Sequence, residues 1–409
     1  MRYRLTFSSV LIFLCTVAFG IRAAGYSEAR AEDWPRWRGP DANGISMETD
    51  WDPEALNRPR ILWKASVGTG YSSVAIKDRY LYTMGNEKNV DTVYCIDAVI
   101  GKEIWHYSYP CMLGEHPGPR VTPAIDGNSV YTLSREGDLF CFNAENGKVR
   151  WKMNITSEFR VSPPKWGFAG SPVIEEGLLI LNAGVSGIAL NKKTGKKIWV
   201  SKPGTGGYAA PVIYDYNGKR CAAIFGEKAL YAVEAKTGKL LWTYPWRTQF
   251  NVNAADPLIV GNRIFISSNY GSGCVLLEMT DKKPKVLWKN KRMSSHFSSF
   301  IYLDGYIYGN DGSSWNSRSV FRCLDISTGK EMWGEPLGFG SLIAVNGKLI
   351  MLNDRGDLFI AEAAHHSYQE IARAEKVLAR TCWTPPVFWN GGIFCRNLRG
   401  DLIYISLKK

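Results

Sequence analysis

Histidine, cysteine and serine side chains could bind a metal or attack a substrate, but they do not form a known catalytic motif in this chain. The five histidines include one adjacent pair, His365 and His366, and no spacing typical of a zinc site. His116 lies in a loop rich in proline and glycine, where we expect a rigid loop with an exposed histidine. Neither a Gly-x-Ser-x-Gly elbow nor a phosphate-binding loop occurs. The sequence predicts no metal site and identifies no catalytic residue.

The elements that position these side chains are repeats. The stretch Ala235–Trp242 reads Ala-Lys-Thr-Gly-Lys-Leu-Leu-Trp, and related stretches recur along the chain. The tryptophans of the repeat are separated by 42, 46, 48, 43, 46 and 45 residues. They are Trp63, Trp105, Trp151, Trp199, Trp242, Trp288 and Trp333. A period of this length indicates repeated supersecondary units.

Each period contains four short apolar runs separated by turns with glycine, asparagine or aspartate. In one unit the expected strands are Val121–Ile125, Ser129–Leu133, Leu139–Asn143 and Val149–Met153. Four antiparallel strands joined by hairpins form a blade, so the sequence predicts an all-β propeller. Eight blades are expected, and they begin near Tyr71, Val121, Ala169, Tyr208, Asn253, Phe297, Gly340 and Thr384.

The last blade is expected to be completed by the N-terminal part of the chain. Residues 386–407 supply only three strands, and the lone strand Ile61–Val67 supplies the fourth, which removes an open sheet edge. The propeller is therefore assigned to residues 61–409. Residues 32–60 are expected to form a strap, whose aromatic residues either pack along the propeller or stack on a ligand.

A binding site is sought in the loops that meet around the propeller axis. The loop before the first strand of a blade and the loop between its second and third strands share one face, where ligands usually bind. The candidates in these loops are Arg120, Trp166, Tyr208, Asn253, Tyr270, His296, Asp311, Arg355, Trp383 and Arg399. Converging cations and aromatic rings could hold an anionic or sugar-like ligand. The alternative is that these loops are polar because they are solvated.

The stretch Leu230–Trp242 resembles the pyrroloquinoline-quinone-type propeller repeat. This repeat is shared by quinoprotein alcohol dehydrogenases and by the outer-membrane assembly factor BamB, and the resemblance covers residues 61–407. It implies that the repeat tryptophans dock against the neighbouring blade. A fold alone does not determine an activity.

Two functions follow from the resemblance. The first is a non-catalytic binding or scaffold propeller of the cell envelope, similar to BamB. The second is an alcohol or sugar dehydrogenase with the quinone and Ca²⁺, whose relatives use adjacent cysteines and a cluster of acidic and amide ligands. This chain has neither adjacent cysteines nor a sequence typical of a calcium loop, so no cofactor is expected. A glycan or polymer binder is the third hypothesis.

The N-terminus is typical of an export signal. Arg2 and Arg4 precede the apolar run Leu5–Phe19, which is shorter than the roughly 20 residues of a membrane span. A Sec-type signal peptide over residues 1–31 predicts a periplasmic or secreted protein, and Cys15 is interpreted as part of it.

The remaining chain is basic, with 46 basic and 37 acidic residues and a net charge of +9. This charge favours an anionic glycan or lipid headgroups, and it allows peripheral contact with a membrane. The resemblance to BamB implies an envelope protein as the partner. Nucleic acid is not expected, and the chain is expected to be a monomer. Turn lysines could form a positive ring on the face opposite the axial loops; they are Lys102, Lys148, Lys196, Lys239 and Lys330.

Eight cysteines follow the signal segment. Cys95, Cys141 and Cys323 fill one equivalent position of the repeat, which other copies fill with Ala189 and Ala232. Cysteines in different blades are too far apart to pair. We therefore expect mostly free, buried thiols.

Overall fold

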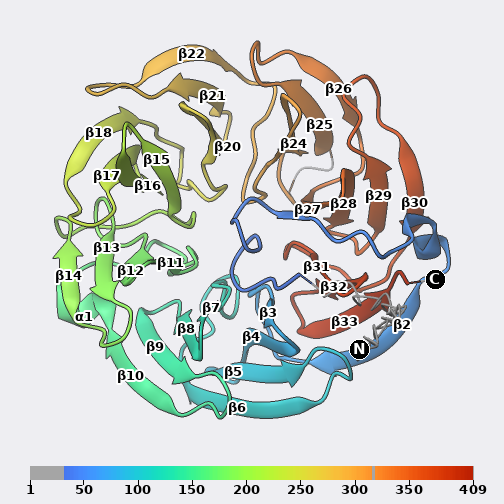
Figure 1. Cartoon of the computed structure of the whole chain (residues 1–409), viewed down its shortest axis with the longest axis horizontal. Helices are drawn as coiled ribbons and strands as arrows, with labels where there is room; N and C mark the ends of the chain where they lie inside the picture. Colours follow the sequence, from blue (N-terminus) through green and yellow to red (C-terminus); the bar gives the residue numbers. More distant parts are fainter. Residues whose placement is uncertain (1–31, 316–317, 409) are drawn as a thin grey trace, which may run out of the picture. The chain divides into compact units, whose positions relative to one another are not determined.

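The computed structural model describes residues 32–315 and 318–408. These residues form eight antiparallel blades of four strands, arranged around a central axis as a β-propeller (Figure 1). The predicted all-β fold and the predicted number of blades are both confirmed. The signal segment predicted for residues 1–31, with Cys15, lies outside the described residues.

The blades follow one another along the chain. The first four consist of β3 (Ala75–Lys77), β4 (Tyr80–Glu87), β5 (Val90–Asp97), β6 (Glu103–Pro110); β7 (Ala124–Asp126), β8 (Ser129–Leu133), β9 (Asp138–Asn143), β10 (Val149–Asn154); β11 (Val173–Glu175), β12 (Leu178–Leu181), β13 (Ile188–Asn191), β14 (Lys197–Val200); and β15 (Val212–Tyr216), β16 (Lys219–Phe225), β17 (Ala229–Glu234), β18 (Leu240–Pro245). A short helix, α1 (Ile155–Phe159), follows β10.

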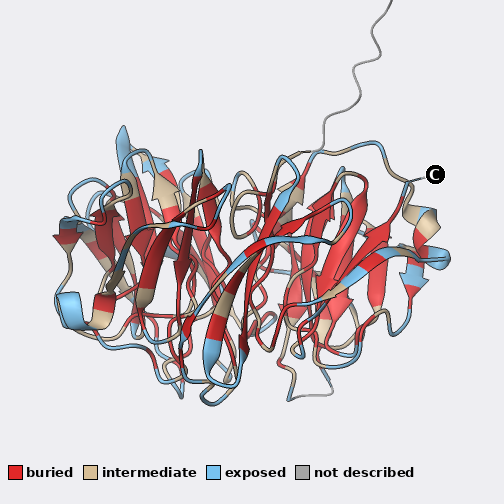
Figure 2. Cartoon of the chain, turned by 90° about the horizontal axis from the view of Figure 1, so that it is seen from below, coloured by how far each residue is buried: buried red, intermediate tan, exposed pale blue. Residues whose placement is uncertain are grey.

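The other four blades consist of β19 (Leu258–Val260), β20 (Arg263–Ser268), β21 (Gly273–Glu278), β22 (Lys285–Asn290); β23 (Ile301–Leu303), β24 (Tyr306–Asp311), β25 (Val320–Asp325), β26 (Glu331–Glu335); β27 (Gly340–Val345), β28 (Lys348–Asn353), β29 (Leu358–Glu362), β30 (Glu370–Ala374); and β31 (Val387–Trp389), β32 (Gly392–Arg396), β33 (Asp401–Ser406) with β2 (Arg60–Ser66). Figure 2 shows that buried residues run through these strands, whereas exposed residues gather in the loops.

The innermost strands are shorter than the sequence predicts. The run expected at Val121–Ile125 becomes β7, which begins only at Ala124. The residues before it bond to neighbouring blades instead, because Thr122 N–H donates to Ser171 Oγ at 2.9 Å and Ser73 N–H donates to Thr122 Oγ1 at 3.2 Å. The segment that precedes the first strand therefore lies along the propeller axis. Its bonds to neighbouring blades hold the adjoining axial loops in place.

Strand β2 closes the ring of blades as predicted. It pairs with β33 in an antiparallel register that runs from Arg60 opposite Ser406 to Ser66 opposite Asp401. The last blade thus combines a strand from the N-terminal part of the chain with three from the C-terminal part, and it has all four strands. Separation of the two ends requires breaking this whole ladder.

The repeat tryptophans join each blade to the next one. The indole N–H of Trp105 donates to the carbonyl oxygen of Ala144 at 2.8 Å, and that of Trp199 donates to Ala235 at 2.8 Å. The turn glycine lies on the same ring: Gly238 has φ +71°, and a Cβ there would lie 2.5 Å from Trp199. The Thr-Gly-Lys turn therefore needs glycine both for its backbone conformation and for contact with the ring.

A β-bulge precedes the repeat tryptophan. In the first blade Cys95 lies opposite Trp105 and Ile96 lies opposite Glu103, so Ile104 is the additional residue. Every outermost strand has a register shift at this position. A bulge bends an exposed edge strand and makes it a poorer template for pairing with another chain.

The N-terminal strap passes through the centre of the ring (Figure 1). Trp34 exchanges backbone hydrogen bonds with Ile76 at 2.8 Å, and β1 (Ile45–Ser46) pairs in parallel with β27. A 3-10 helix, η1 (Pro53–Asn57), then packs against β30. Trp34 is buried and Trp51 packs edge-on against Phe388 at 5.1 Å.

The eight described cysteines are free and buried, in agreement with the sequence-based expectation. They are Cys95, Cys111, Cys141, Cys221, Cys274, Cys323, Cys382 and Cys395. In residues 32–315 and 318–408 there is no helix with the length and apolar character needed to span a membrane.

Asp91 is a carboxyl group buried in the first blade, and it should make stability depend on pH. It accepts a 2.6 Å hydrogen bond from Asn86, but burial is the larger effect and raises its pKa to about 6. Because the folded pKa lies above the ordinary value of about 4, this group's stabilising contribution is present at low pH and is lost as the pH rises toward 6. Asp91→Asn should therefore add about 1–3 kcal/mol to the free energy of unfolding at about pH 8, and nothing at about pH 4.

Urea unfolding of Asp91→Asn and the unmodified chain at both pH values measures this difference. Asp97→Asn is a suitable comparison, because Asp97 also belongs to β5 and its carboxylate is paired with the exposed side chain of Arg79. A gain of equal size at both pH values would show that ionisation of Asp91 is not its cause.

Candidate functional site

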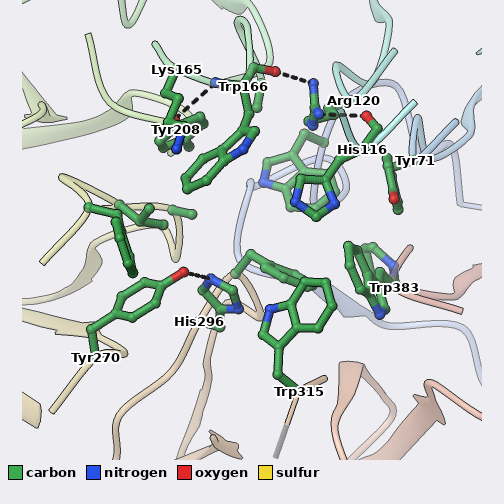
Figure 3. A pocket seen from close by; sticks show the side chains of 17 residues that line it. Tyr71, His116, Arg120, Lys165, Trp166, Tyr208, Tyr270, His296, Trp315 and Trp383 are labelled. Atoms are coloured by element: carbon green, nitrogen blue, oxygen red, sulfur yellow. Dashed lines mark hydrogen bonds between the residues drawn. The ribbon is translucent and has the colours of Figure 1, made fainter. Parts of the chain in front are cut away.

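A cavity of about 470 Å³ opens at the axis, between the loops that precede the first strands. Tyr71, Trp166 and Trp383 enter it from such loops, and Tyr270 enters from the loop between β20 and β21. Figure 3 shows their rings facing one another across the space. This volume lies within the range of small-molecule pockets, about 300–1,000 Å³.

Six of the ten residues predicted from the sequence line this cavity: Arg120, Trp166, Tyr208, Tyr270, His296 and Trp383. The axial loops thus bring aromatic and cationic groups together. What these groups bind remains a prediction.

The other four predicted residues do not line the cavity. Asn253 is buried and joins two blades, since its side chain donates to the carbonyl of Gly226 at 2.9 Å. Asp311 accepts a 3.0 Å hydrogen bond from Arg322. Arg355 and Arg399 are exposed in the hairpins after β28 and β32. A residue can therefore belong to an axial loop without directing its side chain into the cavity.

Eleven further lining residues were not among those predicted, and the aromatic and charged ones are Trp37, Tyr71, His116, Lys165, Phe250, Phe297 and Trp315. Tyr71 occupies the same place in its blade as Tyr208, and this equivalence could have identified it. His116 is half-buried, with its ring 5.9 Å from Trp166 and 6.0 Å from Trp383. The expectation of an exposed loop histidine was therefore wrong.

The floor of the cavity comes from the strap. Trp37 Nε1 donates to Asp256 Oδ2 at 2.6 Å, which holds the ring in the channel. Arg38 donates to the carbonyl of Phe300, and its guanidinium lies 3.9 Å from Asp256. Trp37 therefore forms part of the lining of the cavity.

Arg120 places a positive charge in the wall of the cavity. Its guanidinium donates to the carbonyl oxygens of Trp166, Glu115 and His116, and its Cζ lies 5.8 Å from the ring centre of Tyr71. Burial, with the nearby charge of Arg135, lowers the pKa of Arg120 to about 10, which leaves it charged at neutral pH. None of these contacts of Arg120 is with a carboxylate, so they do not neutralise its charge within the described site.

The two histidines of the cavity are neutral at neutral pH. Burial and the neighbouring His116 lower the pKa of His296 to about 4, and burial and Arg120 lower the pKa of His116. His296 Nε2 shares a 2.9 Å hydrogen bond with the hydroxyl of Tyr270. Its Nδ1 is buried without a partner among the described residues.

Three tryptophans of the cavity are held by carboxylates through their indole N–H groups. Trp383 Nε1 donates to Asp354 at 2.8 Å, and Trp166 Nε1 donates to Glu115 at 3.1 Å, as Trp37 does to Asp256. These N–H groups are therefore already used and are not available to a ligand. Burial raises the pKa of Asp354 despite the opposing charge of Arg380.

A metal site is not found in the part of the chain that the structure describes. Within it, no three His, Cys, Asp or Glu side chains are arranged to hold a metal ion. The described lining of the cavity includes neither carboxylate, amide nor thiol side chains. The groups that face the cavity are aromatic rings, phenols, imidazoles and two cations.

The chain resembles proteins of several activities. It is 26% identical to the tetrathionate hydrolase of Acidithiobacillus ferrooxidans, over 52% of this chain and 45% of that protein. It is also 26% identical to the outer membrane protein assembly factor BamB of Burkholderia pseudomallei, over 60% of this chain and 61% of the relative. The matches thus span less than two thirds of the length of these relatives.

A solved structure supports the fold. The quinohemoprotein alcohol dehydrogenase of Comamonas testosteroni superimposes with a TM-score of 0.69 and 12% identity, over 92% of this chain and 80% of that one. A family model described as outer membrane protein assembly factor BamB matches residues 91–335, more than half of the chain. The chain therefore belongs to the BamB family of outer membrane protein assembly factors.

Proposed function

We propose that this chain is an exported, non-catalytic binding propeller of the cell envelope, and that the axial cavity is its recognition site. The observation that carries the proposal is the composition of the cavity wall, which combines aromatic faces with the cations Arg120 and Lys165. Such a wall binds a ligand by stacking and charge and needs no chemical step. Membership of the BamB family supports a place in the envelope, with an envelope protein as the partner of the propeller surface.

The oxidoreductase alternative requires groups that the described cavity does not contain. A quinone dehydrogenase of the kind that the sequence resembles uses Ca²⁺ with acidic and amide ligands, a catalytic aspartate and a pair of adjacent cysteines. The carboxylates bonded to the walls, Asp256, Asp354 and Glu115, already accept hydrogen bonds from Trp37, Trp383 and Trp166. The residues present do not fit the Ca²⁺ that such an enzyme uses, so we assign no catalytic step to them.

A reconstitution assay tests this proposal. The purified protein without residues 1–31 is incubated with the quinone and Ca²⁺, and cofactor retention and dye-coupled oxidation of a panel of alcohols are measured. We expect no dye reduction above the cofactor alone, while a quinoprotein alcohol dehydrogenase assayed in parallel reduces the dye. Retention of the quinone together with turnover would overturn the binding function.

A further inference from the structure

We infer that the axial cavity binds an aromatic carboxylate, a flat ring with an acid group, whose acid lies on Arg120 and whose ring stacks between the tryptophan faces. This inference rests on the proposed function, because it assigns a ligand class to the same recognition site. Three features of the cavity lead to it, namely its charge, the indoles of its walls, and the lack of carboxylate and amide side chains in its described lining.

The charge of the cavity selects an anion. Arg120 and Lys165 line it, and Lys165 Nζ lies 5.1 Å above the ring of Trp166. The three carbonyl contacts of Arg120 account for three of its five N–H donors, which leaves two for an acid group. A cage of aromatic rings would otherwise suit a quaternary ammonium ion. Two cations without a lining carboxylate make such a ligand unfavourable.

The indoles of the walls select a flat ring. The N–H groups of Trp37, Trp166 and Trp383 already donate to carboxylates, so a ligand meets the apolar parts of these rings. Tyr71 stacks on Trp383 with ring centres 5.1 Å apart and planes 15° apart, which fixes one wall as a planar surface. Aromatic ligands stack on such faces with offset or edge-on geometry.

The lack of carboxylate and amide side chains in the described cavity argues against a sugar. A sugar buries several hydroxyl groups, and each one without a partner costs about 1–3 kcal/mol. Sugar sites satisfy these hydroxyls with carboxylates and amides, and the described lining contains neither. An aromatic acid needs partners only for its carboxylate, so it matches this wall better than an acidic sugar does.

Calorimetric titration with four probes tests the ligand class. The probes are naphthoate, its uncharged analogue naphthamide, glucuronate and phenyltrimethylammonium, each added to the protein without residues 1–31. We expect naphthoate to bind at least about tenfold more tightly than naphthamide, in line with a charge-assisted hydrogen bond.

Variants connect the binding to Arg120. Arg120→Gln should weaken the binding of naphthoate about 10- to 100-fold and leave the binding of naphthamide nearly unchanged. Arg120→Lys should retain part of the affinity that Arg120→Gln loses. Arg355→Gln is the matched control, because Arg355 is exposed in an axial loop and does not line the cavity. It should change naphthoate binding less than about twofold.

The outcomes separate the inference from the proposed function. Tighter binding of glucuronate or of the ammonium ion than of naphthoate would overturn the aromatic carboxylate and keep the cavity as a recognition site. Equal binding of naphthoate and naphthamide would overturn the role of Arg120, and this comparison needs no variant to fold. Absence of binding by every probe would overturn the inference, whereas only turnover in the quinone assay overturns the non-catalytic function.

Discussion

Arg396→Leu should lower the free energy of unfolding by about 3–5 kcal/mol, through lost hydrogen bonds and unpaired carbonyls at the closure of the ring. Arg396 belongs to β32 and is 1% exposed. Its guanidinium donates to the carbonyls of Ser72 and Met84 at 2.6 Å and to that of Gly68 at 3.0 Å. These residues precede or belong to the first blade, so one side chain joins the last blade to the first.

The size of this effect follows from what leucine leaves behind. Each buried carbonyl without a donor costs about 1–3 kcal/mol, and removal of the buried cation returns part of that cost. Burial lowers the pKa of Arg396 to about 9, so the native side chain is charged at neutral pH.

Guanidinium unfolding with a fluorescence readout measures this prediction. Arg399→Leu is the matched control, because Arg399 is exposed in the next hairpin, and it should stay within about 0.5 kcal/mol. Equal midpoints for the two variants would show that Arg396 does not hold the closure.

Asp256→Ala should destabilise the protein by about 3–5 kcal/mol, because it leaves the buried guanidinium of Arg38 without a counter-charge. Both side chains are nearly inaccessible, with Asp256 3% and Arg38 8% exposed. Burial raises the pKa of Asp256 and lowers that of Arg38, in each case against the attraction of the other. Burial of the pair thus costs free energy, and removal of only one of the two charges costs more.

The double variant Arg38→Met with Asp256→Ala separates these two costs. Because it removes both charges, it should be more stable than Asp256→Ala alone, and a double-mutant cycle in urea measures the difference. Naphthoate binding should weaken in Asp256→Ala, since Trp37 loses the acceptor that holds it in the channel. A double variant whose loss equals the sum of the single losses would contradict coupling between the two residues.

The repeat carried the information about the fold because it is periodic. A tryptophan and a glycine that pack on each other recur at several junctions, so Trp199 and Gly238 are visible as spacing in the sequence. The degenerate stretch Asp281–Lys285 has no turn glycine and was found from Trp288, which keeps the spacing. Trp242 packs in the same core cluster as Met279, just before this stretch.

The cavity was only partly predictable because its residues are not periodic. Each blade contributes a different side chain, and whether that side chain reaches the axis depends on the loop. Asn253 and His296 precede equivalent strands, yet Asn253 bonds to Gly226 and His296 faces the cavity.

The strap was the least predictable part. Its path through the channel depends on the burial of Arg38 against Asp256, a contact between residues 218 positions apart. Local sequence patterns do not contain such contacts. For this reason Trp37 was considered as a strap residue that packs or stacks, and its position in the floor of the cavity could be found only from the structure.

The most direct test of the recognition site is to locate a bound ligand. Crystals of the protein soaked with a brominated naphthoate show the bromine by anomalous scattering. We expect its peak between Trp166 and Trp383, with the carboxylate on Arg120, and no such peak in crystals of Arg120→Gln at the same concentration. A bromine on the outer surface, or one that persists in Arg120→Gln, would contradict the axial cavity as the site of anion recognition.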